Sequence, residues 1–233
     1  MQIKPQLFCF TYAGGNKSFF DVIEKDLDGI DVVKLEYAGH GARHKEPFYN
    51  NFDELADDMF HEVKARASGE YALFGYSMGS ISAVEVLKRI IGSGMPEPSH
   101  IFLSAHEPHT KSELLGFTPD ELDEWVKQRT LQFGDVPERL VNSKVFWRLY
   151  LPVYRADYLI IGKYKFEKLD LSTAIPTVIF YSETDTPIQD MKKWENYFKG
   201  SVAYCSYEGN HFFIKQHHKE MAQKIKDRLG ALI

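Results

Sequence analysis

The most restrictive feature of this sequence is the junction in residues 71–90, YALFGYSMGSISAVEVLKRI. An apolar run of strand type turns at GYSMG, where Ser77 lies between two glycines, and continues with apolar residues at helical spacing. A G-x-S-x-G turn between a strand and a helix exposes the serine hydroxyl above a sheet edge, and the glycines allow close packing. Ser77 is therefore a candidate nucleophile, although this composition would produce such a motif by chance in about one chain in fifteen.

The rest of the chain continues the alternation of apolar runs with amphipathic segments. Its 233 residues, 44% of them hydrophobic, suit one large domain with a substantial core, and the alternation predicts an α/β fold with a mostly parallel central sheet flanked by helices. The predicted strands are residues 6–12, 31–37, 71–75, 101–105, 177–181 and 202–207. The predicted helices are residues 19–27, 52–67, 78–91, 189–198 and 213–229.

One region is too long for the alternation. About seventy residues separate the fourth and fifth predicted strands, far more than one crossover helix needs. They hold three helical patterns, TPDELDEWVKQRTLQF, PERLVNSKVFWRLYL and PVYRADYLIIGKY, all rich in Leu and aromatic residues. We expect a helical lid, roughly residues 107–165, inserted within a single domain of residues 1–233. Ordinary surface helices are the alternative.

Charge and cysteine content narrow the class of protein. The net charge is −5 without a basic block, so we expect neither nucleic acid nor an anionic membrane surface as a partner. The sequence contains no secretory leader pattern and no apolar run of membrane-spanning length, which favours a cytoplasmic protein. Cys9 and Cys205 fall in strand-like runs, and we expect two buried thiols rather than a redox or metal site. We also expect a monomer.

A serine nucleophile needs a histidine base and an acid that orients it. His211 follows the last predicted strand and Asp185 follows the fifth, so both should lie at the sheet edge that carries Ser77. Glu183 is the alternative acid. The remaining histidines are judged by position: His106 and His109 follow a strand end and stay open as bases, His100 precedes a strand, and His40, His44, His61, His217 and His218 are expected at the surface.

The chain order of these residues adds weight to the motif. Ser77, Asp185 and His211 follow the Ser…Asp…His order of α/β hydrolases. Such a site also needs an oxyanion hole, for which we expect the backbone N–H of Met78, after the nucleophile, and of Ala13, after the first strand. Gly14 is the fallback for the second donor.

Together, six stretches resemble a known family. They are TYAGG, LEYAGHGARHKEP, GYSMGS, PVYRADYLIIGKY, SETDTPIQDMKKW and EGNHFFI, and the resemblance runs from about Phe8 to Phe213. In this order and spacing they resemble the type II (external, editing) thioesterases of nonribosomal peptide and polyketide synthesis. The resemblance implies a lidded α/β hydrolase that removes misloaded or stalled acyl groups from the phosphopantetheine arm of carrier-protein domains, through an acyl-enzyme on Ser77 and without a cofactor or metal.

The most diagnostic part is P-x-x-R-A-D-Y with a following tyrosine, here Pro152, Arg155, Asp157 and Tyr164. The sequence departs from the family at four places: Thr11 where proline is common, Tyr12 where histidine is usual, Ala38-Gly39-His40 where P-G-R is common, and Ser182 where glycine is frequent. We expect substrate contacts from Tyr12, Gly14, His40, Phe146 and Arg155, with Tyr12 and His40 flanking the site entrance. The lid aromatics expected to form an acyl chamber are Trp125, Phe133, Phe146, Trp147 and Tyr150.

Two other functions stay open at this stage. A general carboxylesterase or lipase would use the same three residues on small oxygen esters. A hydrolase-fold protein that binds acyl carriers without catalysis would have no need of all three.

Overall fold

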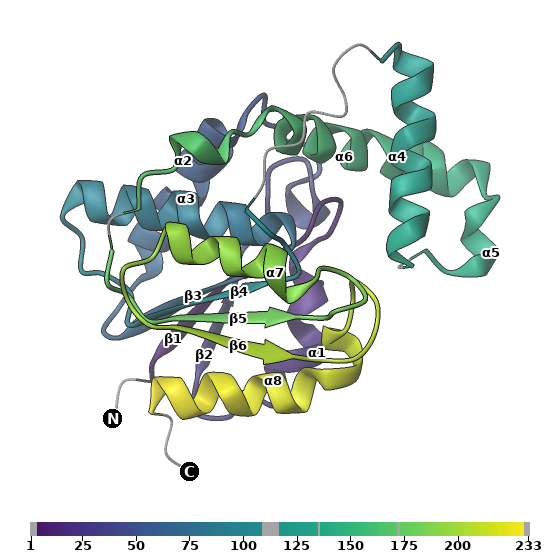
Figure 1. Cartoon of the computed structure of the whole chain (residues 1–233). Coiled ribbons are helices and arrows are strands. Elements are labelled where there is room, and N and C mark those ends of the chain that lie inside the picture. Colours follow the sequence, from purple (N-terminus) through teal and green to yellow (C-terminus); the bar gives the residue numbers. More distant parts are fainter. Residues whose placement is uncertain (1–3, 109–116, 135, 172, 231–233) are drawn as a thin grey trace.

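A computed structural model of the chain describes residues 4–108, 117–134, 136–171 and 173–230. Its centre is a six-stranded sheet in the order β2-β1-β3-β4-β5-β6, with every neighbouring pair parallel (Figure 1). The strands are β1 (Gln6–Phe10), β2 (Asp31–Lys34), β3 (Tyr71–Tyr76), β4 (His100–Ser104), β5 (Thr177–Tyr181) and β6 (Val202–Ser206). The predicted parallel α/β sheet is confirmed, and the boundaries differ by three residues at most.

The strand order reverses between β1 and β3. From β1 the chain moves outward to β2 and then returns to the other side of β1 to form β3. In open parallel sheets, the crevice beyond the carboxyl ends of the strands at such a reversal is where ligands bind. The loop after β1 contains Ala13 and the turn after β3 contains Ser77, so both residues lie at this point of the sheet.

Helices cover both faces of the sheet (Figure 1). One face carries α1 (Asp21–Glu24) and α8 (Ile214–Leu229); the other carries α2 (Phe52–Arg66), α3 (Met78–Ser93) and α7 (Ile188–Met191). Short 3-10 helices lie at Lys17–Phe20, Gly41–Arg43, Phe166–Lys168 and Lys192–Asn196. The predicted helices 19–27 and 189–198 are wrong in extent, because tight three-residue hydrogen bonds such as Tyr197 N–H to the Trp194 carbonyl replace regular turns.

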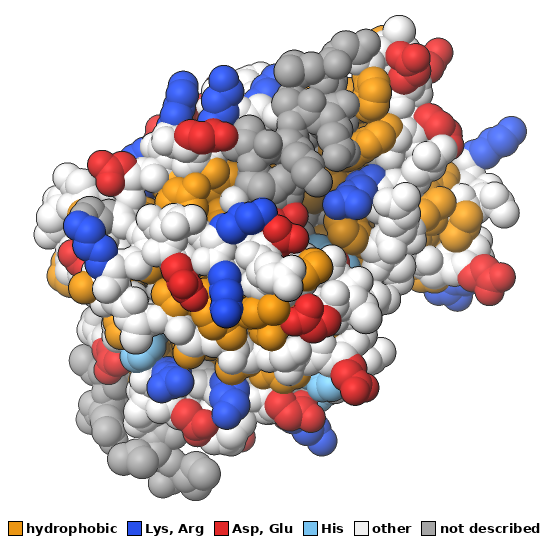
Figure 2. Space-filling model, in the orientation of Figure 1, with side chains coloured by type: hydrophobic (Ala, Val, Ile, Leu, Met, Phe, Trp, Pro, Cys, Tyr) orange, Lys and Arg blue, Asp and Glu red, His pale blue; other side chains and the backbone are white. Residues whose placement is uncertain are grey.

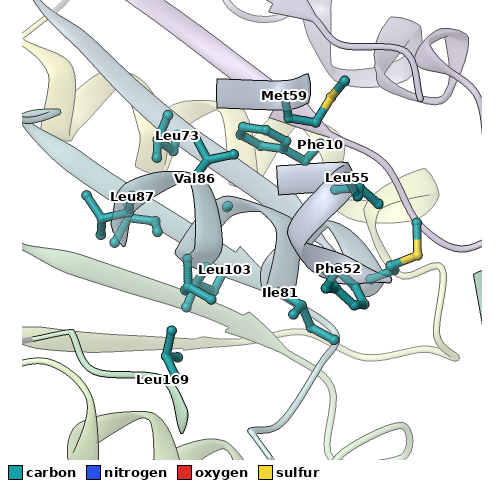
Figure 3. Close-up of a cluster of buried hydrophobic side chains, with 14 of the residues drawn as sticks. Phe10, Phe52, Leu55, Met59, Leu73, Ile81, Val86, Leu87, Leu103 and Leu169 are labelled. Atoms are coloured by element: carbon teal, nitrogen blue, oxygen red, sulfur yellow. The ribbon is translucent and has the colours of Figure 1, made fainter. Parts of the chain in front are cut away.

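Alternation along the central strands fills two cores. Phe8, Phe10, Leu73 and Leu103 face α2 and α3, where they pack with Phe52, Leu55, Met59, Ile81 and Leu87 (Figure 3). The intervening residues Leu7, Cys9, Phe74 and Phe102 pack on the opposite face with α8. Strands buried on both sides read as continuous apolar runs, which is why β1 and β3 were recognisable in the sequence.

A helical insert, here the segment between β4 and β5, contains α4 (Pro119–Phe133), α5 (Glu138–Val141) and α6 (Lys144–Lys163). Helix α4 begins at a complete Thr118–Glu121 capping box with Pro119 in its first turn, as the sequence indicates. The second and third helical patterns join into the single helix α6, with Pro152 inside it. Its buried residues are Leu151, Tyr154, Asp157, Tyr158 and Ile160, so none of them lies in its first two turns.

The surface carries both signs of charge. On the face shown in Figure 2, Lys and Arg side chains lie among Asp and Glu side chains rather than gathering into one patch. Of the helices that the structure describes, none combines the length and the apolar composition needed to span a bilayer.

Candidate active site

Ser77 sits on a strained turn between β3 and α3. Its φ of 54° and ψ of −120° lie outside the ordinary regions for a residue with a side chain. The flanking glycines have a steric reason: a Cβ on Gly79 would lie 2.0 Å from the Phe10 carbonyl oxygen, and one on Gly75 would lie 2.2 Å from the Gly79 carbonyl oxygen. The turn is held by the Ser77 N–H, which donates to the Ser104 carbonyl at 2.8 Å.

His211 and Asp185 reach Ser77 from the ends of β6 and β5. The Ser77 hydroxyl lies 2.9 Å from His211 Nε2, and His211 Nδ1 lies 3.0 Å from both carboxylate oxygens of Asp185. The ring is buried, and the Tyr76 hydroxyl donates to the His211 carbonyl at 2.7 Å. This geometry lets Nδ1–H donate to the carboxylate while Nε2 accepts the serine proton. The alternative acid Glu183 is exposed, and its carboxylate accepts from the Ile188 N–H instead.

The two expected oxyanion donors, Met78 and Ala13, can be located relative to the serine. Met78 is the first residue of α3, so its N–H has no partner inside the helix. Ala13 lines the cavity that contains Ser77. Among the described residues, neither N–H has a hydrogen-bond partner. The fallback donor Gly14 is different, because its N–H donates to the Asp157 carboxylate at 2.6 Å.

A cavity of about 380 Å³ opens over these groups. Its floor contains Ser77, Asp185 and His211, and its walls come from the β1 loop and from the insert. The wall residues include Tyr12, Ala13, His106, Glu107, Trp125, Arg129, Phe133, Tyr154 and Tyr158. The insert therefore supplies most of the aromatic surface that an acyl group would meet.

The expected substrate contacts divide into two groups. Tyr12 lines the cavity, as do the lid aromatics Trp125 and Phe133. His40 was expected at the surface and at the site entrance, and both expectations are wrong: its ring is buried, with Nε2 2.9 Å from Asp157. The Gly14 N–H donates to the Asp157 carboxylate rather than facing the cavity as a free donor.

Two contacts predicted on α6 lie elsewhere. Arg155 forms an ion pair with Asp123 of α4 at 2.5 Å, and Phe146 stacks on Tyr150 with ring centroids 4.9 Å apart; neither is among the cavity residues. Trp147 packs edge-on against Phe146, so these three lid aromatics form a cluster of their own. Of the alternative bases, His106 lines the cavity, while His109 lies outside the described residues.

Sequence reasoning missed two contacts from the insert. The ring of Phe133 stacks on the His211 ring, with centroids 4.0 Å apart and planes at 28°. Asp157 joins Gly14 to His40. The sequence shows Phe133 as an aromatic residue and Asp157 as part of the P-x-x-R-A-D-Y signature, but nothing in local spacing identifies partners that lie so far away in the chain.

No metal site accompanies this geometry. Within residues 4–108, 117–134, 136–171 and 173–230, no group of three or more His, Cys, Asp and Glu side chains is arranged to hold an ion.

The sheet is parallel, and a strained serine follows β3, an aspartate follows β5 and a histidine follows β6, all at the same edge. This arrangement defines an α/β-hydrolase fold. The sequence profile of the thioesterase domain family matches residues 5–229. The chain belongs to this family of thioester hydrolases, and the resemblance drawn from the sequence is confirmed.

Proteins with related sequences match over nearly the whole chain. The medium-chain S-acyl fatty acid synthase thioesterase of Rattus norvegicus is 28% identical over 213 residues, covering 90% of this chain and 81% of that protein. Gramicidin S biosynthesis protein GrsT of Aneurinibacillus migulanus is 26% identical over 236 residues, covering 99% and 91%. The solved type II thioesterase BorB, from the borrelidin biosynthetic cluster, is 25% identical with a TM-score of 0.83, covering 98% of this chain and 94% of BorB.

Proposed function

We propose that this protein is an editing thioesterase that removes misloaded or stalled acyl groups from the phosphopantetheine arm of carrier-protein domains. The observation that carries the proposal is the chain of hydrogen bonds from Asp185 through His211 to Ser77, which ends on the floor of an aromatic-walled cavity. The relatives add the substrate class, because one is named an S-acyl fatty acid synthase thioesterase and another a type II thioesterase of a biosynthetic cluster.

The reaction runs in two halves. The Ser77 hydroxyl attacks the thioester carbonyl while His211 Nε2 takes its proton, and Asp185 holds the imidazolium that forms. The N–H groups of Ala13 and Met78 stabilise the oxyanion of the tetrahedral intermediate. The C–S bond breaks, His211 returns the proton to the leaving thiol, and an acyl-enzyme remains. Water, deprotonated by His211, attacks this ester and releases the acid with the Ser77 hydroxyl restored.

The insert acts as a lid in this proposal. Trp125 and Phe133 on α4, together with Tyr154 and Tyr158 on α6, form the walls against which the acyl group packs. A carrier domain meets the protein transiently in the cytoplasm, and the protein works as a monomer.

The test compares three substrates with the same acyl group: an acyl-carrier protein, acyl-coenzyme A and a nitrophenyl ester. We expect the highest kcat/KM on the acyl-carrier protein. An equal or higher kcat/KM on the oxygen ester would make the protein a general carboxylesterase instead.

Two serine variants, one just before α3 and one at its last residue, test the nucleophile. Ser77→Ala should lower kcat by about 10⁴-fold or more, because removing one member of such a triad leaves only binding and oxyanion stabilisation. Ser93→Ala, at the far end of α3, removes a hydroxyl that donates to the Ile90 carbonyl at 2.9 Å and should leave kcat unchanged. Undiminished hydrolysis by Ser77→Ala would point to another nucleophile or to a protein that only binds carriers.

A further inference from the structure

One carboxylate of the insert joins two loops at the sheet edge. Asp157 on α6 is only 2% exposed. Its Oδ2 accepts from the Gly14 N–H at 2.6 Å and lies 2.9 Å from His40 Nε2. Gly14 follows β1 and His40 follows β2, so Asp157 connects the insert to both loops. The mechanism above uses neither Asp157 nor His40.

The partners of His40 fix its protonation state. Its Nδ1 lies 2.9 Å from the Ala38 carbonyl oxygen, and its Nε2 faces the Asp157 carboxylate. Both partners accept hydrogen bonds, and an imidazolium, with a proton on each ring nitrogen, satisfies both of them. Asp157 Oδ2 in turn receives two donors, as an ionised carboxylate does. The contact is therefore a buried ion pair between an imidazolium and a carboxylate.

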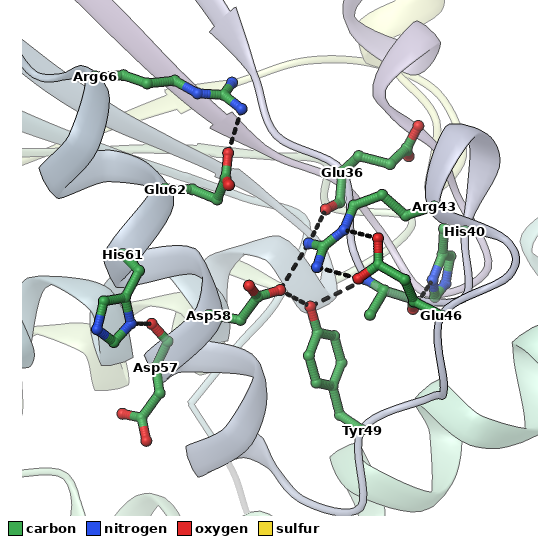
Figure 4. Close-up of polar contacts among 11 residues, drawn as sticks. Glu36, His40, Arg43, Glu46, Tyr49, Asp57, Asp58, His61, Glu62 and Arg66 are labelled. Carbon is green, nitrogen blue, oxygen red and sulfur yellow. Dashed lines mark hydrogen bonds and ion pairs between the residues drawn. The ribbon is translucent and has the colours of Figure 1, made fainter.

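The loop that carries this imidazolium is firmly held (Figure 4). The Arg43 guanidinium donates to the Asp58 carboxylate at 2.7 Å and to the Glu36 carbonyl at 3.0 Å. The Tyr49 hydroxyl accepts from the Ala38 N–H at 3.0 Å and donates to Asp58. His40 thus presents its charge from a fixed position rather than from a free loop.

Asp157 acts on the turn that carries an oxyanion donor. The Gly15 N–H donates to the Tyr12 carbonyl at 3.0 Å, and Gly14 has a φ of +77°, so residues 12–15 form a turn with a left-handed third residue. The Tyr12 carbonyl and the Ala13 N–H belong to the same planar peptide and point in opposite directions. Holding this turn therefore sets the direction of the Ala13 N–H.

We propose that Asp157, kept ionised and in place by the His40 imidazolium, is a positioning residue for the oxyanion hole. The inference rests on the proposed hydrolase function, and it gives the insert a task beyond covering the cavity. It predicts that loss of the Asp157 charge impairs the transition state more than the binding of substrate.

Other groups around the pair decide its response to pH. Burial alone lowers the pKa of His40, but the Asp157 carboxylate, the Ala38 carbonyl and the Glu36 carboxylate outweigh it, so the pKa lies above its ordinary value of 6.5. The Tyr37 and Phe48 rings pack edge-on against His40, and Tyr158 follows Asp157 on α6; burial raises the pKa of both tyrosines, which keeps them neutral. The His40 imidazolium is fully formed below its ordinary pKa of 6.5, and the ion pair is lost as the pH rises through the raised folded pKa of His40.

The test uses two Asp→Asn changes in the insert. Asp157→Asn removes the charge at nearly the same size, whereas Asp123→Asn weakens only the Arg155 ion pair between α4 and α6. For each protein we would measure kcat and KM on an acyl-coenzyme A, and the inhibition constant of an alkyl trifluoromethyl ketone, whose adduct with serine carries an oxyanion. Asp157→Asn should lower kcat and the affinity for the ketone by a similar factor of at least tenfold, with KM changed less than threefold. Asp123→Asn should resemble the wild type.

A second variant covers the case in which Asp157→Asn does not fold. His40→Gln keeps a donor but removes the charge, so it should lower kcat most where the wild-type ring is an imidazolium, below its ordinary pKa of 6.5, and approach the wild type as the pH rises through the raised folded pKa of His40. A wild-type to His40→Gln kcat ratio that stays constant with pH would overturn the proposal. So would Asp157→Asn with unchanged kcat, or an equal loss in Asp123→Asn. If the wild type itself hydrolyses no thioester, the proposed function fails instead, which is a separate result.

Discussion

Gly79→Ala is the sharpest test of how the sheet positions the nucleophile. Gly79 lies in the first turn of α3, two residues after Ser77, against the end of β1. A Cβ there would lie 2.0 Å from the Phe10 carbonyl oxygen, 2.6 Å from the Phe10 carbonyl carbon and 2.8 Å from the Thr11 carbonyl oxygen. All three atoms belong to backbone, so no side-chain rotation can relieve the contact.

The size of the effect follows from these distances. Real Cβ contacts essentially never fall below 3.0 Å, so α3 and β1 would have to separate by about 1 Å, the difference between 3.0 and 2.0 Å. Overpacking of this kind costs about 3 kcal/mol, the upper end of its usual range. For a chain of this size that loss lowers Tm by about 6–12 °C. A shift of 1 Å between Ser77 and the β1 loop should also lower kcat by about 100-fold.

The control is the same substitution elsewhere on the helix. A Cβ on Gly92, near the end of α3, meets nothing within 4 Å. Gly92→Ala should therefore raise the free energy of unfolding by up to about 1 kcal/mol through helix propensity alone. Thermal denaturation and steady-state thioester hydrolysis of both variants complete the assay. A Gly79→Ala protein within 1 kcal/mol of the wild type, with normal kcat, would refute the reasoning.

Three further predictions address the site and the cores. Phe133→Leu removes the ring stacked on His211, which should lower kcat about 2- to 10-fold in steady-state kinetics, the worth of one aromatic contact; an unchanged kcat would show that the stacking does not orient the base. His40→Gln should reduce the fall in the free energy of unfolding as the pH rises above about 6.5, because the interaction that raises the pKa of His40 stabilises the fold only while the ring is protonated. Urea titrations at several pH values measure this free energy, and an equal fall in the variant and the wild type would contradict the prediction. Burial raises the pKa of both thiols, but Cys9 is fully buried and Cys205 is partly exposed. A maleimide should therefore label Cys205 first in the native protein and both cysteines after unfolding, as read by mass spectrometry.

The fold was largely predictable because its signals are local. Strands β1, β3 and β5 are apolar on both faces, and α2, α3 and α8 carry helical periodicity, so a window of a few residues contains the evidence for each. The helices predicted after β1 and after β5 are longer than the regular helices α1 and α7 found there. Their apolar residues suit helical spacing, but the backbone there follows tight turns such as the Leu27 N–H to the Glu24 carbonyl.

The candidate site was predictable to the extent that it depends on strand ends. Parallel strands deliver their following loops to one edge, so Ser77, Asp185 and His211 could be brought together from chain order alone. The contacts of the insert could not. Arg155 pairs with Asp123, and Asp157 with Gly14 and His40, and these partners lie 32, 143 and 117 residues away in the chain, beyond the reach of any local pattern.

The two buried His–Asp pairs show what sequence cannot supply. His211 and His40 each lie close to an aspartate, at 3.0 and 2.9 Å. The two pairs differ in the group that faces the other ring nitrogen of each histidine. The Ser77 hydroxyl can donate, so His211 can keep Nε2 free of a proton and act as a base. The Ala38 carbonyl accepts from Nδ1 of His40 and the Asp157 carboxylate from Nε2, so the imidazolium has no lone pair left to take a proton. The same pair of residue types thus gives a base in one place and a fixed cation in the other, and a backbone carbonyl makes the difference.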